Sequence, residues 1–595
     1  MVTEKELNDL PKMVRWFDPG AIIKILKPVM VSGIFGQYAD RRLMQAALDQ
    51  GLPIDYAKRA DIRKQFPQTA DGAIWIDFVA DLGDGFDSTY AIASLLAQEK
   101  IDLAAIPTSR GSVLILGGDQ VYPDATVENY LQHFHLPYSW AFPDQGGDDG
   151  SWHPRIYAIP GNHDWYDGLD AFTGLFCSHK DWKVGNWRAK QERSYFALQL
   201  TDRVWLWGVD IQLSERVDQP QAAYFRKIAA DMPQNSQIIL CTAVPGWYGA
   251  DDIKDKAFSS LGYFASSVLL KAKKDHRVVL VLSGDTHHYC RYNAINSGTM
   301  FITSGGGGAF LHPTHQLRNQ ISCPWWMGKS DTFELAKVDE AGLIANGQPA
   351  CFPDKSESKV LLRENKWFPF FNWKFSLMLG IIYSILGLFG LMFSELSDLS
   401  ILMSNPVWLI EVIALVSIFY KYADGSQWLR DGTKILQPEK SYLRKLATGI
   451  PHGVLQIILM TVISQVIYTL LVADRGLSFW GWSFNAAFIL LATFYNGILG
   501  SFLFGMYLTF TCRKLSINAN DSYSAMSLNS HRHFLRLKIT HDKIMVFPIG
   551  LREIPKRTHW RTRSSTESSP SPSLVQPANP MTPQLIEGPI ELKLA

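Results

Sequence analysis

Four long apolar stretches in the second half of this 595-residue chain limit its possible folds more than any other feature. Residues 375–393 contain nineteen consecutive residues without a charged side chain, which is long enough to cross a bilayer as a helix. Soluble helices seldom stay apolar on every face over such a length, so a buried soluble bundle is a poor alternative. The sequence therefore predicts a transmembrane region over residues 375–511, with helices at 375–393, 401–420, 453–472 and 486–510.

The charges between these stretches predict their orientation. Residues 394–400 contain acidic side chains and no lysine or arginine, whereas residues 421–451 contain six basic side chains. Lys374 precedes the first stretch and Arg513 follows the last. Because basic loops stay in the cytoplasm, we expect a multi-pass integral membrane protein, in an inner or plasma membrane, with both termini cytoplasmic.

The first half of the chain has a different pattern. Short apolar strands alternate with helical stretches from residue 73, which is typical of a mixed α and β domain. Several of these strands stop abruptly at loops that carry carboxylate, amide and imidazole groups, and loops at the carboxyl ends of strands can converge. One such loop would be an ordinary turn, but four in series predict a metal site. The four loops are residues 81–85, 117–122, 160–164 and 283–289.

Composition gives no support to two other classes of protein. The chain has 57 basic and 56 acidic residues, so its charge does not point to nucleic acid as a partner. Its six cysteines are scattered, with no pair at metal-binding or redox spacing. This pattern favours reduced thiols over a disulfide framework.

Taken together, the four loops resemble the motifs of the calcineurin-like metallophosphoesterases, and are most similar to those of the purple acid phosphatase branch. The resemblance covers about residues 73–320. It implies an α+β fold, a two-sheet β-sandwich flanked by helices, with two metal ions at the strand ends. The motifs are Asp81-x-Gly83, Gly118-Asp119-x-x-Tyr122, Gly161-Asn162-His163-Asp164 and Gly284-Asp285-x-His287.

The resemblance also implies a ligand set. Asp119 would bridge two divalent or trivalent ions (Fe, Mn or Zn), which activate a water and hold the phosphoryl oxygens. Many family members have a His where this chain has Gly83, and the purple acid phosphatase branch has a Tyr ligand at the position of Tyr122. The implied first-site ligands besides Asp119 are Asp81, Tyr122 and His287, and those of the second site are Asn162 and Asp285.

Two departures from the family pattern affect the second metal site. Ala243 stands where the family supplies a His before a Pro, and Asp285 replaces another His. An oxygen ligand at residue 285 favours a hard ion such as Mn²⁺ or Mg²⁺ over Zn²⁺. After the glycine-rich residues 304–308, His312 and His315 either reach the mouth of the site or are surface histidines. His288 has no assigned role but lies in the same stretch.

For the reaction itself, the resemblance implies that His163 acts as a proton donor or phosphate contact, with Asp164 holding its imidazole. We therefore expect a membrane-anchored hydrolase of a phosphomonoester or phosphodiester, with a membrane lipid phosphate as one candidate substrate and the lipid bilayer as its partner. The alternative is a catalytically impaired relative with a regulatory or scaffolding role.

The expected division of the chain follows from these features. The metallophosphoesterase domain would occupy residues 71–350 and be joined by a linker, residues 351–374, to the transmembrane region. The other expected parts are an N-terminal helical extension (1–70), a cytoplasmic C-terminal segment with a β-hairpin (512–560) and a disordered tail (561–595).

Overall fold

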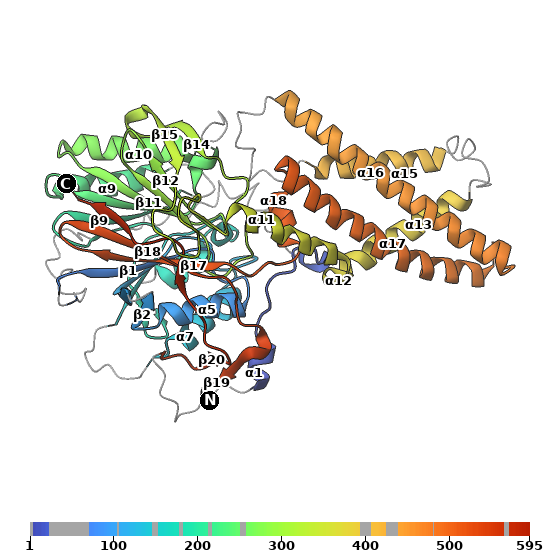
Figure 1. The fold of residues 1–595 in the computed structure, drawn as a ribbon, viewed down its shortest axis with the longest axis horizontal. Helices are drawn as coiled ribbons and strands as arrows, with labels where there is room; N and C mark the ends of the chain where they lie inside the picture. Colours follow the sequence, from blue (N-terminus) through green and yellow to red (C-terminus); the bar gives the residue numbers. More distant parts are fainter. Residues whose placement is uncertain are drawn as a thin grey trace. The chain divides into compact units, whose positions relative to one another are not determined.

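The chain folds into two compact units, which are described separately below (Figure 1). One comprises Met1–Val14, Ile25–Lys355 and Asn529–Ala595, and the other comprises Arg15–Lys24 and Ser356–Leu528. The computed structural model describes residues 4–22, 69, 71–103, 106–144, 153–177, 182–211, 217–249, 257–392, 406–423, 438–479, 481–563 and 571–594.

Within the described residues, the first unit contains two nine-stranded sheets. The order of the first sheet is β21-β18-β17-β1-β4-β5-β7-β6, with β22 also paired to β18. Its strands are β1 (Ile74–Val79), β4 (Val113–Leu116), β5 (Arg155–Ala158), β6 (Lys183–Val184), β7 (Trp187–Ala189), β17 (Arg532–Ile539), β18 (Lys543–Leu551), β21 (Gln584–Leu585) and β22 (Ile590–Lys593).

The second sheet has the order β14-β15-β12-β13-β11-β10-β9-β8, with β16 also paired to β12. Its strands are β8 (Phe196–Gln199), β9 (Val204–Val209), β10 (Gln237–Thr242), β11 (Arg277–Ser283), β12 (Tyr289–Ala294), β13 (Met300–Ser304), β14 (Gln320–Pro324), β15 (Ser330–Leu335) and β16 (Cys351–Phe352).

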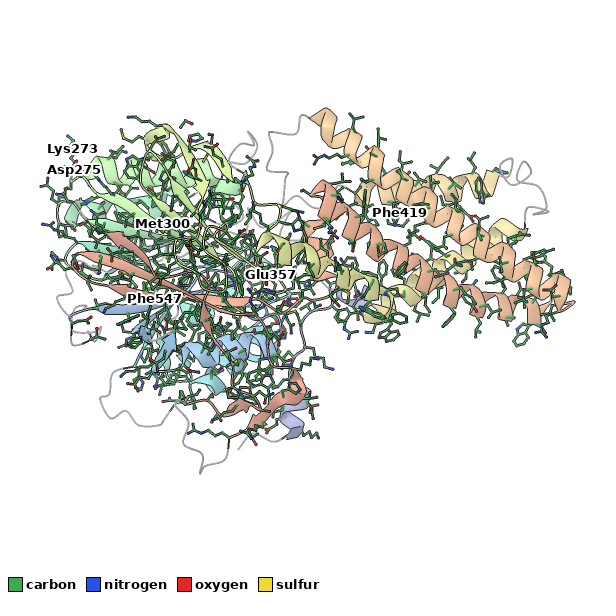
Figure 2. The ribbon with its side chains drawn as sticks, viewed as in Figure 1. Lys273, Asp275, Met300, Glu357, Phe419 and Phe547 are labelled. Carbon is green, nitrogen blue, oxygen red and sulfur yellow. The ribbon has the colours of Figure 1, made fainter. Side chains whose placement is uncertain are left out.

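One core lies between the sheets and two lie outside them. Residues of both sheets, among them Ile76 and Leu280, form the inner core. The outer faces are covered by helices, including α5 (Phe86–Leu96) on the first sheet and α10 (Ala257–Ala272) on the second. The expected α+β sandwich flanked by helices is confirmed. Figure 2 shows Met300 of β13 and Phe547 of β18 among the side chains of this unit.

Parallel pairing aligns the strands that carry the motif loops. In the first sheet β1, β4 and β5 are parallel neighbours, and in the second β9, β10, β11 and β13 are. All residues of β1, β4 and β10 are buried, which agrees with their continuous apolar sequences. The loops after parallel strands leave the sheet at the same edge, and this arrangement positions the site.

The chain returns to the first unit after the helical region. The predicted hairpin is present as antiparallel strands β17 and β18, and β17 also pairs with β1. The prediction of a disordered tail is wrong for residues 571–594, which contain β20 (Val575–Pro577), β21 and β22. Buried Ile586 and the buried Glu587 carboxylate, which accepts hydrogen bonds from Arg291, stabilise it.

The first compact unit also differs from the predicted domain boundaries. The first unit extends beyond residue 350 to Lys355 and includes the hairpin and the C-terminal strands. Of the N-terminal extension, α1 (Glu4–Asp9) is helical, whereas residues 23–68 lie outside the described part of the chain.

The second unit is built from α13 (Trp373–Met392), α15 (Pro406–Tyr422), α16 (Pro438–Thr469) and α17 (Trp482–Phe510), and Figure 2 labels Phe419 on α15. Among the described residues, three helical segments are long and apolar enough to cross a membrane: Trp373–Leu391, Leu443–Asp474 and Trp482–Leu515. The other predicted span, 401–420, includes residues 401–405 outside the described part, so a fourth crossing stays a prediction.

Small residues let two of these helices approach closely. A Cβ atom on Gly380 of α13 would lie 2.2 Å from the carbonyl oxygen of Thr493 in α17, and one on Gly497 would lie 2.7 Å from the carbonyl oxygen of Ser376. Close backbone contact at small residues is typical of helices that associate within a membrane.

We predict that a buried ion pair holds the returning hairpin in the sheet. Arg536 of β17 donates to both carboxylate oxygens of Asp77 in β1, at 2.8 and 3.2 Å, and both side chains are buried. Arg536→Ala leaves the Asp77 carboxylate buried without its partner, which should destabilise the first unit by about 3–5 kcal/mol. The measurement is chemical denaturation of the purified chain.

The control for this variant is Lys543→Ala in β18. The Lys543 ion pair with Glu591 has a similar N–O distance, 3.0 Å, but is exposed to solvent. Lys543→Ala should therefore leave the unfolding midpoint nearly unchanged. Equal effects of the two substitutions would contradict the role of the buried pair.

Candidate metal centre

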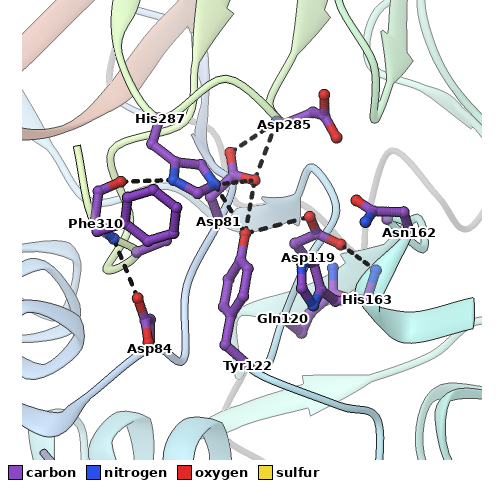
Figure 3. Close-up of polar contacts among 12 residues, drawn as sticks. Asp81, Asp84, Asp119, Gln120, Tyr122, Asn162, His163, Asp285, His287 and Phe310 are labelled. Carbon is purple, nitrogen blue, oxygen red and sulfur yellow. Dashed lines mark hydrogen bonds and ion pairs between the residues drawn. The ribbon is translucent and has the colours of Figure 1, made fainter. Parts of the chain in front are cut away.

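The structure brings the six predicted ligands together where β1, β4, β5 and β11 end (Figure 3). The chain turns sharply at three of them, since Asp81, Asp119 and Asp285 all have left-handed backbone conformations, with φ of 58°, 49° and 66°. Such conformations are rare outside glycine and are concentrated at functional sites. The Asp285 N–H donates to both Asp81 oxygens, at 3.0 and 2.9 Å, which joins the first and last loops.

Glycine allows two of the loops to approach each other. A Cβ atom on Gly161 would lie 2.1 Å from Asp119 Oδ1, so a side chain at residue 161 would displace the carboxylate. A Cβ atom on Gly118 would lie 2.8 Å from Cβ of Ala243. Ala243 therefore lies beside the Asp119 loop, as the family pattern implies, but brings no ligand atom.

The first group of ligand atoms surrounds the Tyr122 hydroxyl. Tyr122 Oη lies 3.3 Å from Asp81 Oδ1, 3.2 Å from Asp119 Oδ2 and 3.0 Å from Nε2 of His287. His287 Nε2 is 3.7 Å from Asp81 Oδ1. Two ligand atoms about 2.1 Å from one ion lie roughly 3.0–3.4 Å apart, so most of these separations fit a shared cation.

The second group surrounds the amide of Asn162. Its oxygen faces Asp119 Oδ2 at 3.0 Å and Asp285 Oδ1 at 3.2 Å, while its nitrogen donates to the Tyr166 hydroxyl at 3.0 Å. Turning the amide over would replace these oxygen contacts with two hydrogen bonds. In the orientation present, the Asn162 oxygen lies from one oxygen of each carboxylate at the separation expected between two ligands of one hard cation.

Asp119 joins the two groups through one atom. Its Oδ2 is the oxygen close to both Tyr122 and Asn162, whereas its Oδ1 accepts a hydrogen bond from the His163 N–H at 2.9 Å. The His163 N–H therefore binds the Asp119 oxygen that faces away from the other candidate ligands. Oδ2 is the atom that would bridge two ions.

The buried carboxyl groups of the centre favour the binding of positive charge. Burial raises the pKa of the Asp81 carboxyl well above its usual range, and the Asp119 and Asp285 carboxylates raise it further. Burial likewise raises the pKa of Asp119, and that of Asp285 rises through burial and the Asp119 charge. Oδ2 of Asp285 is buried and has no hydrogen-bond partner among the described residues. Cations bound here would offset the repulsion among the three carboxylates.

His287 is held in the neutral form, which can bind a metal ion. Burial lowers the pKa of its imidazole well below the ordinary value, which keeps the ring uncharged. Its Nδ1 lies 2.6 Å from the carbonyl oxygen of Phe310, the arrangement in which Nδ1–H donates and Nε2 presents its lone pair to the centre. The residues present therefore fit two metal ions.

No group of three His, Cys, Asp or Glu side chains in the described part of the chain could hold a metal ion by itself. The first group needs Tyr122 and the second needs Asn162. The centre consequently depends on two side chains, Tyr122 and Asn162, that are not among the commonest metal ligands.

The expected partner of His163 is corrected by the structure. Its Nδ1 lies 2.9 Å from the carbonyl oxygen of Pro123, and its ring packs against Tyr122 with 4.3 Å between ring centroids. The carboxylate of Asp164 instead accepts hydrogen bonds from the N–H groups of Gly161 and Gln120 and from the Tyr130 hydroxyl. Successive side chains of the 3₁₀ helix His163–Trp165 project in different directions, so Asp164 braces the second and third motif loops.

The three additional histidines lie in different surroundings. The ring of His312 stacks on His287 at 4.1 Å between centroids, so it lines the centre behind a ligand. His288 is buried and its ring faces Tyr248 at 6.1 Å between centroids, while its ring nitrogens have no hydrogen-bond partner in the part of the chain that the structure describes. His315 is half-buried farther along the same loop.

Sequence reasoning missed the groups that hold His287. Asp84 Oδ2 accepts a hydrogen bond from the Phe310 N–H at 3.2 Å, and the carbonyl of Phe310 contacts the imidazole. The other Asp84 oxygen accepts from the N–H of Val14 at 2.9 Å, and burial raises the pKa of Asp84 to about 7. Asp84 lies within the first motif loop, but the backbone groups that it binds are remote in sequence.

Comparisons with known proteins give partial structural likenesses and one family match. Among the solved structures that resemble part of the chain are three whose TM-scores are too low to support an argument. They are GAP50, the anchor in the inner membrane complex of Plasmodium (10% identity, TM-score 0.30, 47% of this chain and 79% of that one); PhoD (10%, 0.28, 40% and 58%); and purple acid phosphatase PPD1 from yellow lupin seeds (14%, 0.26, 41% and 45%).

The chain thus spans less than two thirds of PhoD and of the lupin enzyme. No protein with a curated description matches the sequence. The family model of the calcineurin-like phosphoesterases matches residues 74–289, which contain all six candidate ligands and His163. Residues 74–289 of this chain are therefore a calcineurin-like phosphoesterase domain.

Proposed function

We propose that the chain is a membrane-anchored, metal-dependent phosphoesterase that hydrolyses a phosphomonoester or phosphodiester. The observation that carries this proposal is the pair of ligand groups that share Oδ2 of Asp119. Two ions held there would activate a water and stabilise the phosphoryl oxygens. Iron, manganese or zinc suits the first group, and the all-oxygen second group favours a hard ion such as Mn²⁺ or Mg²⁺.

His163 is the residue proposed to contact the substrate. The Pro123 carbonyl accepts from Nδ1–H, and the ring is held between Tyr122 and Tyr166, at 4.3 and 4.8 Å between centroids. With Nδ1 engaged in this way, we propose that Nε2 is the nitrogen that faces a phosphate ester. In the protonated imidazole, Nε2–H can donate to a phosphate oxygen or pass its proton to the leaving group.

Asp164 acts indirectly in this proposal. It is fully buried and joins the backbone of the third motif loop at Gly161 to that of the second at Gln120. It is therefore a positioning residue for the loops that carry Asp119 and Asn162.

The predicted membrane region favours a substrate that lies in the bilayer. Three helical segments are long and apolar enough to cross a bilayer, and the loop charges favour cytoplasmic termini and a cytoplasmic phosphoesterase domain. An enzyme held at a bilayer has access to phosphate esters in that bilayer. We therefore propose a membrane lipid phosphate as the first substrate class to test.

The function is tested with the purified full chain and p-nitrophenyl phosphate or its bis-ester in the presence of Mn²⁺. Asp119→Asn, which alters the proposed bridging carboxylate, should abolish hydrolysis. His163→Ala should reduce kcat by roughly 10²–10⁴-fold, as expected for loss of a general acid. The matched control is His541→Ala, at an exposed histidine in the hairpin turn, which should retain wild-type activity.

The alternative function predicts a different result. Wild type, Asp119→Asn and His163→Ala would then be equally inert with Mn²⁺, Fe, Zn²⁺ and Mg²⁺. The absence of a ligand at Ala243 is the feature that favours this regulatory or scaffolding alternative.

Metal binding should weaken as the pH falls. Since the pKa values of Asp81, Asp119 and Asp285 are raised without metal, a cation must displace protons from the carboxyl groups. His287 is already neutral and contributes no proton. Calorimetric titration with Mn²⁺ should give tighter binding at pH 8 than at pH 6, with proton release to the buffer. Equal affinity at both pH values and no proton release would contradict the carboxylate centre.

A further inference from the structure

The segment before the first predicted span has an inverted distribution of polar and apolar side chains. It comprises α11 (Lys355–Leu361), the 3₁₀ helix η5 (Leu362–Trp367) and α12 (Phe368–Phe371), and it leads into α13 (Figure 1). Asn365 and Asn372 are buried, whereas Trp367, Phe370 and Trp373 are 52%, 61% and 52% exposed. A segment folded for water would have the opposite arrangement.

Hydrogen bonds explain why the asparagines face inward. Asn365 Nδ2 donates to the carbonyl of Ser522 at 3.0 Å, and Asn372 Nδ2 donates to that of Ala525 at 2.7 Å. The Thr509 hydroxyl of α17 donates to the carbonyl of Leu362 at 3.1 Å. These contacts fix the rotation of the segment on the helices of its own unit. The exposure of the aromatic side chains is therefore built into the fold.

The outer face combines the aromatic rings with positive charge. Arg363 and Lys366 are exposed, as is Glu364 between them. The Lys366 ammonium lies 5.4 Å from the centre of the Trp367 ring. Arg513 and Lys514 are exposed at the end of α17, and α17 packs against both η5 and α12. Basic side chains are thus concentrated at this end of the helical unit.

Aromatic rings beside lysine and arginine, next to a predicted span, match the interface of a bilayer. Tryptophan is favoured at the depth of the lipid headgroups, and basic residues near a span bind anionic phospholipids. A large exposed apolar patch on a soluble protein would instead be a liability. Trp373 is also the first residue of the apolar segment Trp373–Leu391, so the face continues into the membrane region.

We propose that residues 360–374 form a membrane-surface element that inserts Trp367, Phe370 and Trp373 at the headgroup boundary and binds anionic phospholipid through Arg363 and Lys366. The occupant is the bilayer that α13 is proposed to cross, so this inference rests on the membrane placement in the proposed function. It does not depend on the phosphoesterase activity. The element would place the domain boundary at the surface of the membrane.

The depth of the element is tested with the full chain reconstituted in nanodiscs of brominated phosphatidylcholine and phosphatidylserine. A fluorophore is attached at Phe370→Cys in a Cys177→Ser background, because the other five cysteines are buried. Ile385→Cys on α13 and Lys273→Cys in the first unit mark the bilayer interior and the solvent. We expect quenching by bromine near the headgroups at residue 370, quenching by deeper bromine at residue 385, and none at residue 273.

The controls separate the ways in which this experiment can fail. Quenching at residue 385 without quenching at residue 370 overturns the surface element but leaves the membrane span intact. No quenching at residue 385 overturns the membrane placement and this inference with it. In both cases hydrolysis of p-nitrophenyl phosphate still reports on the phosphoesterase proposal independently.

The charge component is tested with the double variant Arg363→Gln/Lys366→Gln. Purified from mixed phosphatidylcholine and phosphatidylserine, it should retain phosphatidylserine less than wild type does, by on the order of fivefold for each charge removed. Lys271→Gln/Lys273→Gln removes two exposed charges from the first unit and should retain the wild-type amount. Equal retention by all three proteins, measured by native mass spectrometry, would contradict the role of Arg363 and Lys366.

Discussion

Three buried carboxylates of like charge are the constraint on which the rest of the first unit depends. Asp81, Asp119 and Asp285 come from three separate loops, and each has its pKa raised by burial. Without positive charge they would repel one another, and with two cations bound they would become ligands that join both sheets. The left-handed turns and the absence of side chains at Gly118 and Gly161 are explained by this convergence.

The scaffold around the centre is assembled from distant parts of the chain. The Phe310 carbonyl orients His287, Asp84 holds Phe310, and the Arg532 guanidinium from β17 donates to the neighbouring Ala309 carbonyl. Glu587, near the C-terminus, accepts hydrogen bonds from Tyr289 and Arg291, which follow the last motif in β12. Segments on both sides of the helical region thus stabilise the same centre.

Much of the centre could be predicted from sequence because each motif is local. A strand that ends in Asp81, Asp119 or His287 is visible within a few residues, and the family resemblance supplies their common destination. The pairing of β17 with β1 was not predictable in this way, since Arg536 and Asp77 are 459 positions apart and no local pattern selects the partner strand. The strands near Ile586 and Ile590 could not be predicted, because the preceding residues are rich in serine and proline and indicate disorder. Asp164 was misassigned because adjacency in sequence does not place two side chains together in a 3₁₀ turn.

We propose that these loops hold two metal ions, and the metal content of the purified chain tests this most directly. The full chain, purified without chelator and loaded with Mn²⁺, would be measured by elemental analysis after removal of free metal. We predict two equivalents of metal per chain, with Asn162 and Asp285 completing the second site despite Ala243. One equivalent would show that the second group does not bind metal, and none would contradict the metal centre altogether.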